Sequence, residues 1–153
     1  MASRTSPSEP ANCLCFNLRK AARAITRIYD GVLAPVGLKA TQFTVLQIAS
    51  EAGGTAMSRL AGRLGMDRTT LTRNLQPLEK LGLISVGAGK DRRERSIRVT
   101  EAGREVLEKA LPLWESAQSK LYSALGPVAF VSLLDRLDSV IDKATAQTAV
   151  VRK

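Results

Sequence analysis

Residues 57–75, MSRLAGRLGMDRTTLTRNL, decide the fold of this chain. Apolar residues recur at helical spacing over 57–64, which predicts a short amphipathic helix. Gly65-Met66 predicts a tight corner after it, and a second helix is expected to open at Asp67. The leucines of this second helix face a core. Its exposed face carries hydroxyls and two cations, namely Arg68, Thr69, Thr70, Thr72 and Arg73.

A β-hairpin is expected directly after the two helices. The patterns over 83–86 and 96–99 predict its strands, and the glycine- and arginine-rich segment between them predicts its tip. Two helices joined by a tight corner and followed by a basic hairpin are typical of a winged helix-turn-helix. The second helix suits the major groove of DNA, and a flexible arginine tip suits the phosphates or the minor groove. The candidate DNA contacts are therefore the five exposed residues of the second helix and, in the hairpin, Asp91, Arg92, Arg93 and Arg95.

The positive charge of the chain is concentrated in this segment. The 153 residues carry a net charge of +9, with 23 basic and 14 acidic side chains. Residues 57–104 hold eleven basic and five acidic residues, whereas residues 105–153 hold six of each. A bland excess of surface charge would be spread more evenly, so the clustering favours a polyanion such as double-stranded DNA as the partner.

The composition disfavours several classes of function. The chain has no histidine, which removes the commonest general base and metal ligand, and no paired carboxylates mark a hydrolytic centre. We therefore expect no enzyme activity, no metal site and no cofactor. No apolar run reaches the roughly 20 residues of a membrane span, and the first ten residues lack the apolar stretch of a secretion signal. The expected location is the cytoplasm, without a membrane partner.

Helices are expected on both sides of the winged segment. An amphipathic helix from Asn12 to about Leu33, with Asn12 as its cap, precedes a helix capped by Thr41. On the C-terminal side, Thr100-Glu101 begins a long helix, and Gly126-Pro127 separates it from the last one. The predicted fold class is mainly α with a small β-wing.

The terminal helices carry more apolar surface than the small winged core can cover. The simplest solution is that they pack with the same helices of a second copy. A two-fold dimer also places two DNA-contacting helices roughly 34 Å apart, which is one turn of DNA. We therefore divide the chain into a disordered tail over 1–10, a winged helix-turn-helix DNA-binding domain over 36–103, and a helical dimerisation region made of 11–35 and 104–153.

In order and spacing, these segments resemble the MarR family of transcriptional regulators from Asn12 to about Ala144. The residues that carry the resemblance before the second helix are Leu38, Thr41-Gln42-Phe43, Leu46, Leu60-Ala61 and Leu64. Those that carry it afterwards are Arg68-Thr69-Thr70-Leu71-Thr72-Arg73, residues 78–84, Asp91-Arg92-Arg93 and Val99-Thr100-Glu101-Ala102-Gly103.

The resemblance implies a triangular homodimer, a pseudo-palindromic operator, and repression relieved by a small ligand or an oxidant. It also implies that Arg93 enters the minor groove at the wing tip, where Asp91 orients it. The family places its effector between the dimer helices and the winged domain. Arg19 and Arg23, near Tyr29, are the candidates to hold a small anionic or phenolic ligand there.

The segment Asn12-Cys13-Leu14-Cys15-Phe16 leaves two interpretations open. It resembles a redox-sensing branch of the family, the organic hydroperoxide repressors, in Leu14-Cys15-Phe16 and Tyr29, whereas Arg19 and Phe43 stand where that branch has further tyrosines. Cys15 lies in the first turn of the helix, with Arg19 four residues further on the same face. Two cysteines two residues apart on a helix point in different directions, so a bridge between them needs local unfolding. The other interpretation is that both are small buried residues at the dimer interface.

The sequence thus predicts a homodimeric, sequence-specific DNA-binding regulator, a repressor that a small-molecule ligand releases. One alternative is a thiol-based redox-sensing repressor that uses Cys15. Another is a small thiol peroxidase that uses the same cysteine, although this leaves the basic hairpin unexplained. A third is a non-specific nucleoid-binding protein, which its affinity for random DNA would distinguish.

Overall fold

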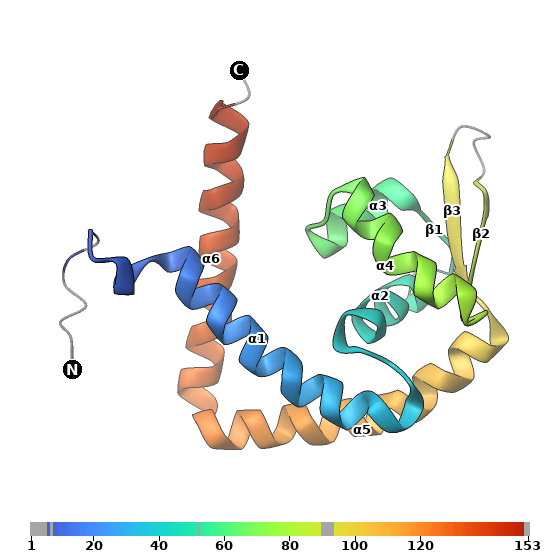
Figure 1. Ribbon diagram of the computed structural model, residues 1–153, viewed down its shortest axis with the longest axis horizontal. Helices are drawn as coiled ribbons and strands as arrows, with labels where there is room; N and C mark the ends of the chain where they lie inside the picture. Colours follow the sequence, from blue (N-terminus) through green and yellow to red (C-terminus); the bar gives the residue numbers. More distant parts are fainter. Residues whose placement is uncertain (1–5, 7, 52, 90–93, 152–153) are drawn as a thin grey trace. The chain divides into compact units, whose positions relative to one another are not determined.

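The computed structural model describes residues 6, 8–51, 53–89 and 94–151, and Figure 1 shows how its elements are connected. The predicted mainly α fold with a small sheet is confirmed. In chain order the elements are η1 (Pro10–Asn12), α1 (Leu14–Leu33), η2 (Ala34–Val36), α2 (Ala40–Glu51), β1 (Thr55–Ala56), α3 (Met57–Leu64), α4 (Arg68–Lys80), β2 (Ile84–Ala88), β3 (Arg95–Val99), α5 (Glu101–Leu125) and α6 (Pro127–Val151).

Two compact units make up the chain, Met1–Trp114 and Glu115–Lys153. The boundary lies inside α5, so this helix begins in the first unit and ends in the second. Of the predicted tail over 1–10, residues 1–5 and 7 lie outside the described residues, and Pro10 begins the short turn η1.

The first unit contains the predicted helix-turn-helix and wing (Figure 1). Its antiparallel sheet has the strand order β1-β3-β2. The hairpin of β2 and β3 pairs Ile84 with Val99 and Ala88 with Arg95, so both strands are longer than the sequence predicted. The short strand β1, which pairs Thr55 with Ile97, was not predicted, because two residues show no alternation.

The core of this unit lies between α2, α3, α4 and one face of the sheet. The ring of Phe43 on α2 stacks on Trp114 of α5 with a centroid distance of 5.9 Å. Burying one leucine side chain stabilises the fold by about 1.5–3 kcal/mol, so the leucines fix α4 firmly on one face. The largest fully buried side chains are Leu33, Leu38, Val45, Leu46, Leu60, Leu71, Leu78 and Ile97.

Several helix ends lie where the sequence predicted them. Asp67 precedes α4 as its cap, and Thr100 precedes α5 with Glu101 in the first turn. Gly126 adopts a φ of 79°, and Pro127 follows it as the first residue of α6. These boundaries depend on local chemistry alone, which is why the sequence was sufficient to find them.

Two predicted caps were wrong. Helix α1 begins after Cys13, and the Asn12 side chain instead donates a hydrogen bond to the Ser6 carbonyl at 2.8 Å. Helix α2 begins at Ala40, one residue before the predicted cap Thr41. The Ala40 N–H donates to the Asp30 carboxylate at 2.8 Å, so an acidic residue of another helix supplies the acceptor expected from the threonine.

Large apolar side chains remain exposed on the terminal helices. On α1 only Leu33 is buried, although Tyr29 and Val32 pack against the core. The exposed apolar side chains of α1 are Leu14, Phe16, Ile25 and Ile28, and those of α6 are Val128, Val131, Leu133, Leu134 and Ile141.

Among the described residues no single helix is long and apolar enough to cross a membrane. The segments Leu14–Val36 and Ala40–Glu51 pass the test of length and composition only as a pair, and they are bent by 72° relative to each other.

Candidate DNA-binding interface

The outer face of α4 forms the first half of the predicted interface. Leu71, Leu75 and Leu78 are buried against the core, which turns the opposite face of the helix outward. Because these leucines fix the rotation of α4, its predicted contacts lie together on two consecutive turns. Thr72 is half-buried. The other four are exposed, namely Arg68, Thr69, Thr70 and Arg73.

Asp67 caps α4 with both of its carboxylate oxygens. Its Oδ1 accepts a hydrogen bond from the Thr70 N–H, and its Oδ2 accepts one from the Thr70 hydroxyl, both at 2.8 Å. These bonds to the ionised form hold the pKa of Asp67 below its ordinary value, and the charge of Arg73 adds a smaller effect. The hydroxyl proton of Thr70 is therefore engaged inside the protein.

The other two threonines of α4 differ in whether their hydroxyls have a hydrogen-bond partner. The Thr72 hydroxyl donates to the Arg68 carbonyl at 2.8 Å. The Thr69 hydroxyl has no hydrogen-bond partner within the part of the chain that the structure describes. Because a phosphate oxygen only accepts hydrogen bonds, Thr69 is the threonine that is ready to donate to DNA.

The corner between α3 and α4 is held from both sides. Gly65 adopts a φ of 61°, and the Met66 N–H bonds to the Ala61 carbonyl at 2.9 Å. From the other side, the Asn74 side chain donates to the Thr70 carbonyl at 2.9 Å and lies 3.9 Å from the Met66 sulfur. The direction in which α4 leaves the corner is thus fixed by glycine geometry and by a side chain.

The wing forms the second half of the predicted interface. Asp91, Arg92 and Arg93 lie outside the described residues, whereas Arg95 is the exposed first residue of β3. Next to Arg95, toward the tip of the hairpin, the Glu94 Oε1 accepts a hydrogen bond from the Ser58 hydroxyl at 2.6 Å. This bond ties the hairpin to α3, the first helix of the helix-turn-helix.

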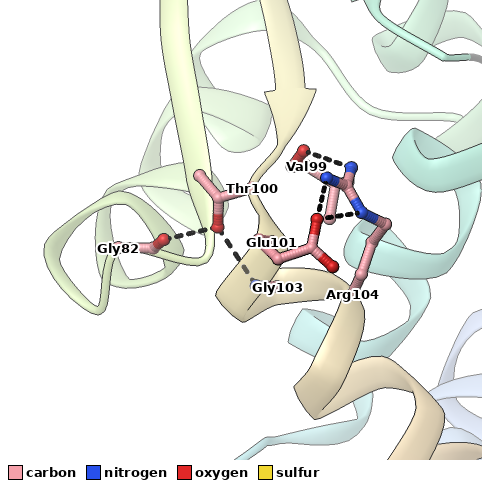
Figure 2. Close-up of polar contacts among 6 residues, drawn as sticks. All are labelled: Gly82, Val99, Thr100, Glu101, Gly103 and Arg104. Atoms are coloured by element: carbon pink, nitrogen blue, oxygen red, sulfur yellow. Dashed lines mark hydrogen bonds and ion pairs between the residues drawn. The ribbon is translucent and has the colours of Figure 1, made fainter.

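Thr100 fixes the other end of the hairpin to the start of α5 (Figure 2). Its hydroxyl donates to the Gly82 carbonyl at 2.7 Å and accepts from the Gly103 N–H at 3.1 Å. One hydroxyl therefore joins the segment after α4 to the first turn of α5. Gly103 is buried here, and a Cβ at this position would overlap the Leu83 carbonyl oxygen and lie 2.8 Å from Val99 Cγ1.

Arg104 makes a second connection at the same junction (Figure 2). Its guanidinium pairs with the Glu101 carboxylate, and its Nη1 donates to the Val99 carbonyl at 3.2 Å. The hydrogen bond from Arg104 lowers the pKa of Glu101. The last residue of β3 is thereby held against the first turn of α5.

The candidate effector and redox residues all lie on α1. Arg19 and Arg23 are exposed, and burial raises the pKa of Tyr29, which packs against the core. At about 1.5 Å per helical residue, Arg19 and Tyr29 are about 15 Å apart along the helix, so one chain does not bring them together. Cys13 and Cys15 are free and exposed in the single chain, at the cap and in the first turn of α1.

Sequence reasoning missed two arginines. Arg59 and Arg98 lie on α3 and β3 and line a groove beside the wing. Both belong to the basic segment 57–104, but no pattern in the sequence indicates which arginines of that segment have acidic partners.

This chain is similar in sequence to transcriptional regulators. The profile of the MarR family matches residues 38–94. The organic hydroperoxide resistance transcriptional regulator of Bacillus subtilis (strain 168) is 30% identical over 103 residues, which are 67% of this chain and 70% of that relative.

Solved structures extend the similarity to nearly the whole chain. The M. tuberculosis transcriptional regulator MosR in complex with DNA has 39% sequence identity and a TM-score of 0.75, over 85% of this chain and 97% of that one. The transcriptional repressor CouR bound to a 23-mer DNA duplex has 27% identity and a TM-score of 0.77, over 91% of this chain and 99% of that one.

Proposed function

The chain belongs to the MarR family of DNA-binding transcriptional regulators, and from this premise we propose that it is a homodimeric repressor of a pseudo-palindromic operator. A small anionic or phenolic ligand binds the repressor and releases it from DNA. The ligand does so by shifting the population of dimers toward a spacing of the two α4 helices that does not fit the operator.

The observation that carries this proposal is the outer face of α4. Arg68 and Arg73 are exposed on it together with Thr69, whose hydroxyl has no partner among the described residues, while the leucines behind them are buried. Arginine grips guanine with two hydrogen bonds, and threonine contacts phosphates or the thymine methyl. MosR and CouR, which share the fold, were solved bound to DNA, and CouR is described as a repressor.

Dimerisation is supported by the apolar side chains that the single chain leaves exposed. Val128 on α6 is 83% exposed and Leu14 on α1 is 58% exposed. Large apolar side chains left exposed on each of these helices are typical of an interface between copies. We assign dimerisation to residues 11–35 and 104–153, and DNA binding to residues 36–103.

Selection of bound genomic fragments followed by sequencing tests the proposal. We expect an inverted repeat whose half-sites are one helical turn apart. Arg73→Ala and Arg93→Ala are each expected to weaken binding to that repeat by about 1–3 kcal/mol without unfolding the protein. Fragments without a shared motif would contradict sequence-specific repression.

Redox control is a second candidate, because Cys15 is a free thiol that is exposed in the single chain. The Bacillus subtilis relative is described as an organic hydroperoxide resistance regulator. In such a step the Cys15 thiolate attacks a peroxide oxygen and the O–O bond breaks. The sulfur is oxidised to a sulfenic acid, and the peroxide is reduced to an alkoxide, which leaves and takes up a proton from water to become an alcohol.

Operator release by an organic hydroperoxide separates the two candidates. Release that is lost in Cys15→Ser and kept in Cys13→Ser would establish redox control. Release that survives both substitutions, or no release at all, would favour a reversible small ligand.

A further inference from the structure

A groove beside the wing has no residue of α4 in its lining. It has a volume of about 440 Å³ and runs between the start of α3 and the strand β3. None of its residues belongs to the predicted DNA contacts. Its lining includes the side chains of Arg59, Glu94, Ser96 and Arg98 and the backbone of Gly53 and Gly54.

The two arginines of the groove carry uncompensated charge. The ion pairs within the described ranges involve Lys39, Arg63 and Arg104. Over those same ranges, Arg59 and Arg98 have neither an ion-pair partner nor a hydrogen-bond partner, and both are exposed. A guanidinium presents a planar fork of donors that matches phosphate and carboxylate oxygens.

The backbone beside the groove supports the side chain of Arg98. Ile97 is buried, so its neighbour Arg98 projects from the opposite face of the sheet, where the groove lies. Gly54 adopts a φ of 116°, and a Cβ there would lie 3.5 Å from Arg98 Cγ and 3.6 Å from Nε. The stem of Arg98 is therefore packed along Gly54, which holds its guanidinium at the groove.

Glu94 is the acidic side chain in the lining of this groove. Its Oε1 accepts the hydrogen bond from the Ser58 hydroxyl at 2.6 Å, so the partner of this carboxylate is a neutral donor. Because Glu94 pairs with serine rather than with arginine, the described residues of the lining contribute two positive charges and one negative charge.

We infer that this groove is a second DNA contact, in which Arg59 and Arg98 hold a backbone phosphate. The inference rests on the proposed function and adds a contact to it. A phosphate of DNA is favoured over a free anion because the groove adjoins the predicted interface: Arg59 belongs to the first helix of the helix-turn-helix, and Glu94 directly precedes the predicted wing contact Arg95. The contact positions the protein without reading bases, and Glu94 weakens it.

Salt titrations of DNA affinity test the inference. Binding of full-length protein to operator and to random DNA is measured by fluorescence anisotropy between about 50 and 200 mM salt. Arg59→Ala and Arg98→Ala are each expected to reduce the slope of log K against log salt by about 0.9. Each is expected to weaken binding to both DNAs by about tenfold, because a phosphate contact carries no sequence information.

Arg63→Ala is the matched control. It removes the same charge one turn further along α3, but Arg63 is paired with Glu51 and lies outside the groove lining. The salt slope of this variant is expected to equal that of the wild type. Glu94→Gln keeps an acceptor for Ser58 and removes the repulsion, so it is expected to bind both DNAs more tightly.

Three results would overturn the inference. One is a wild-type slope in Arg59→Ala and Arg98→Ala while Arg73→Ala loses operator preference, which leaves the proposed function intact. Another is an equal loss of slope in Arg63→Ala, which reduces the effect to net charge. The third concerns inorganic phosphate as the probe. If phosphate raised the melting temperature of the wild type but not that of the double variant Arg59→Ala, Arg98→Ala, and the double variant bound DNA as the wild type does, the groove would be assigned to a free anion. Failure of the wild type to bind any DNA would instead contradict the proposed function itself.

Discussion

Three threonines on α4 have the same side chain and different tasks. The Thr70 hydroxyl completes the cap of the helix, and the Thr72 hydroxyl bonds back to the preceding turn. The Thr69 hydroxyl has no partner among the described residues. Residue type and exposure alone assign all three to DNA, whereas their hydrogen bonds separate a structural role from a contact role.

Thr69→Val and Thr70→Val form a matched pair that tests this division. Valine keeps the shape of threonine and removes its hydroxyl. Thr69→Val is expected to weaken DNA binding by about 0.5–1.5 kcal/mol and to leave the melting temperature unchanged. Thr70→Val is expected to lower the melting temperature, because the Asp67 carboxylate loses a donor. Thermal unfolding and DNA titration of both variants check this, and equal effects on stability would contradict it.

Asp67 makes the stability of α4 depend on pH. Its hydrogen bonds with Thr70 depress its pKa in the folded protein, so its contribution is complete above the unfolded pKa of about 4. The contribution is lost as the pH falls through the lower folded pKa. Asp67→Ala is therefore expected to lower the melting temperature most at neutral pH and least in acid.

Asp67→Asn is the control, because asparagine keeps an acceptor for the cap and carries no charge. Its melting temperature is expected to lie between those of the wild type and Asp67→Ala at pH 7. The difference between the wild type and Asp67→Asn is expected to shrink as the pH falls. A difference that does not change with pH would show that the charge of Asp67 contributes nothing.

Among the helices and strands, the packing of α5 on the hairpin depends on one glycine. Gly103 is buried at this contact, and a Cβ would overlap the Leu83 carbonyl oxygen. Gly103→Ala is therefore expected to destabilise the protein by about 3 kcal/mol or more, because backbone rather than a flexible side chain has to move. Chemical denaturation measures the change.

Gly62→Ala is the matched control for this substitution. Gly62 lies inside α3 and has no positive φ, and a Cβ added there would meet no atom within 4 Å. Alanine at this position is expected to stabilise the protein by about 0.5–1 kcal/mol, because it restricts the unfolded chain. If Gly103→Ala behaved like Gly62→Ala, the close packing of α5 on the hairpin would be contradicted.

The sequence predicted the elements whose signals are local. The leucine spacing of α3 and α4, the helix start expected at Asp67 and the Thr100 cap were sufficient to locate the helix-turn-helix and the start of α5. The Thr41 cap failed because Asp30, ten residues before Ala40 and on another helix, supplies the acceptor. Which hydroxyls and guanidinium groups are already engaged depends on tertiary contacts, so the groove of Arg59 and Arg98 was beyond sequence reasoning.

For the molecule as a whole, the exposed apolar face of α6 predicts a dimer. Sedimentation at micromolar concentration is expected to show a dimer for the wild type. The double variant Val128→Glu, Val131→Glu is expected to weaken dimerisation about a hundredfold or more, because buried carboxylates without partners cost several kcal/mol. Gln147→Glu, at an exposed polar position of α6 about 100° around the helix from Val128 and about 160° from Val131, controls for added charge and is expected to remain a dimer. A folded wild-type monomer would contradict the dimer.

Whether this chain regulates by sequence-specific DNA binding is decided by the ratio of its affinities for two DNAs. Fluorescence anisotropy compares the selected operator with a random duplex of equal length at the same salt concentration. We expect the protein to bind the operator about a thousandfold more tightly, or better. Equal affinity for the two duplexes would contradict sequence-specific regulation and would favour a non-specific nucleoid-binding protein instead.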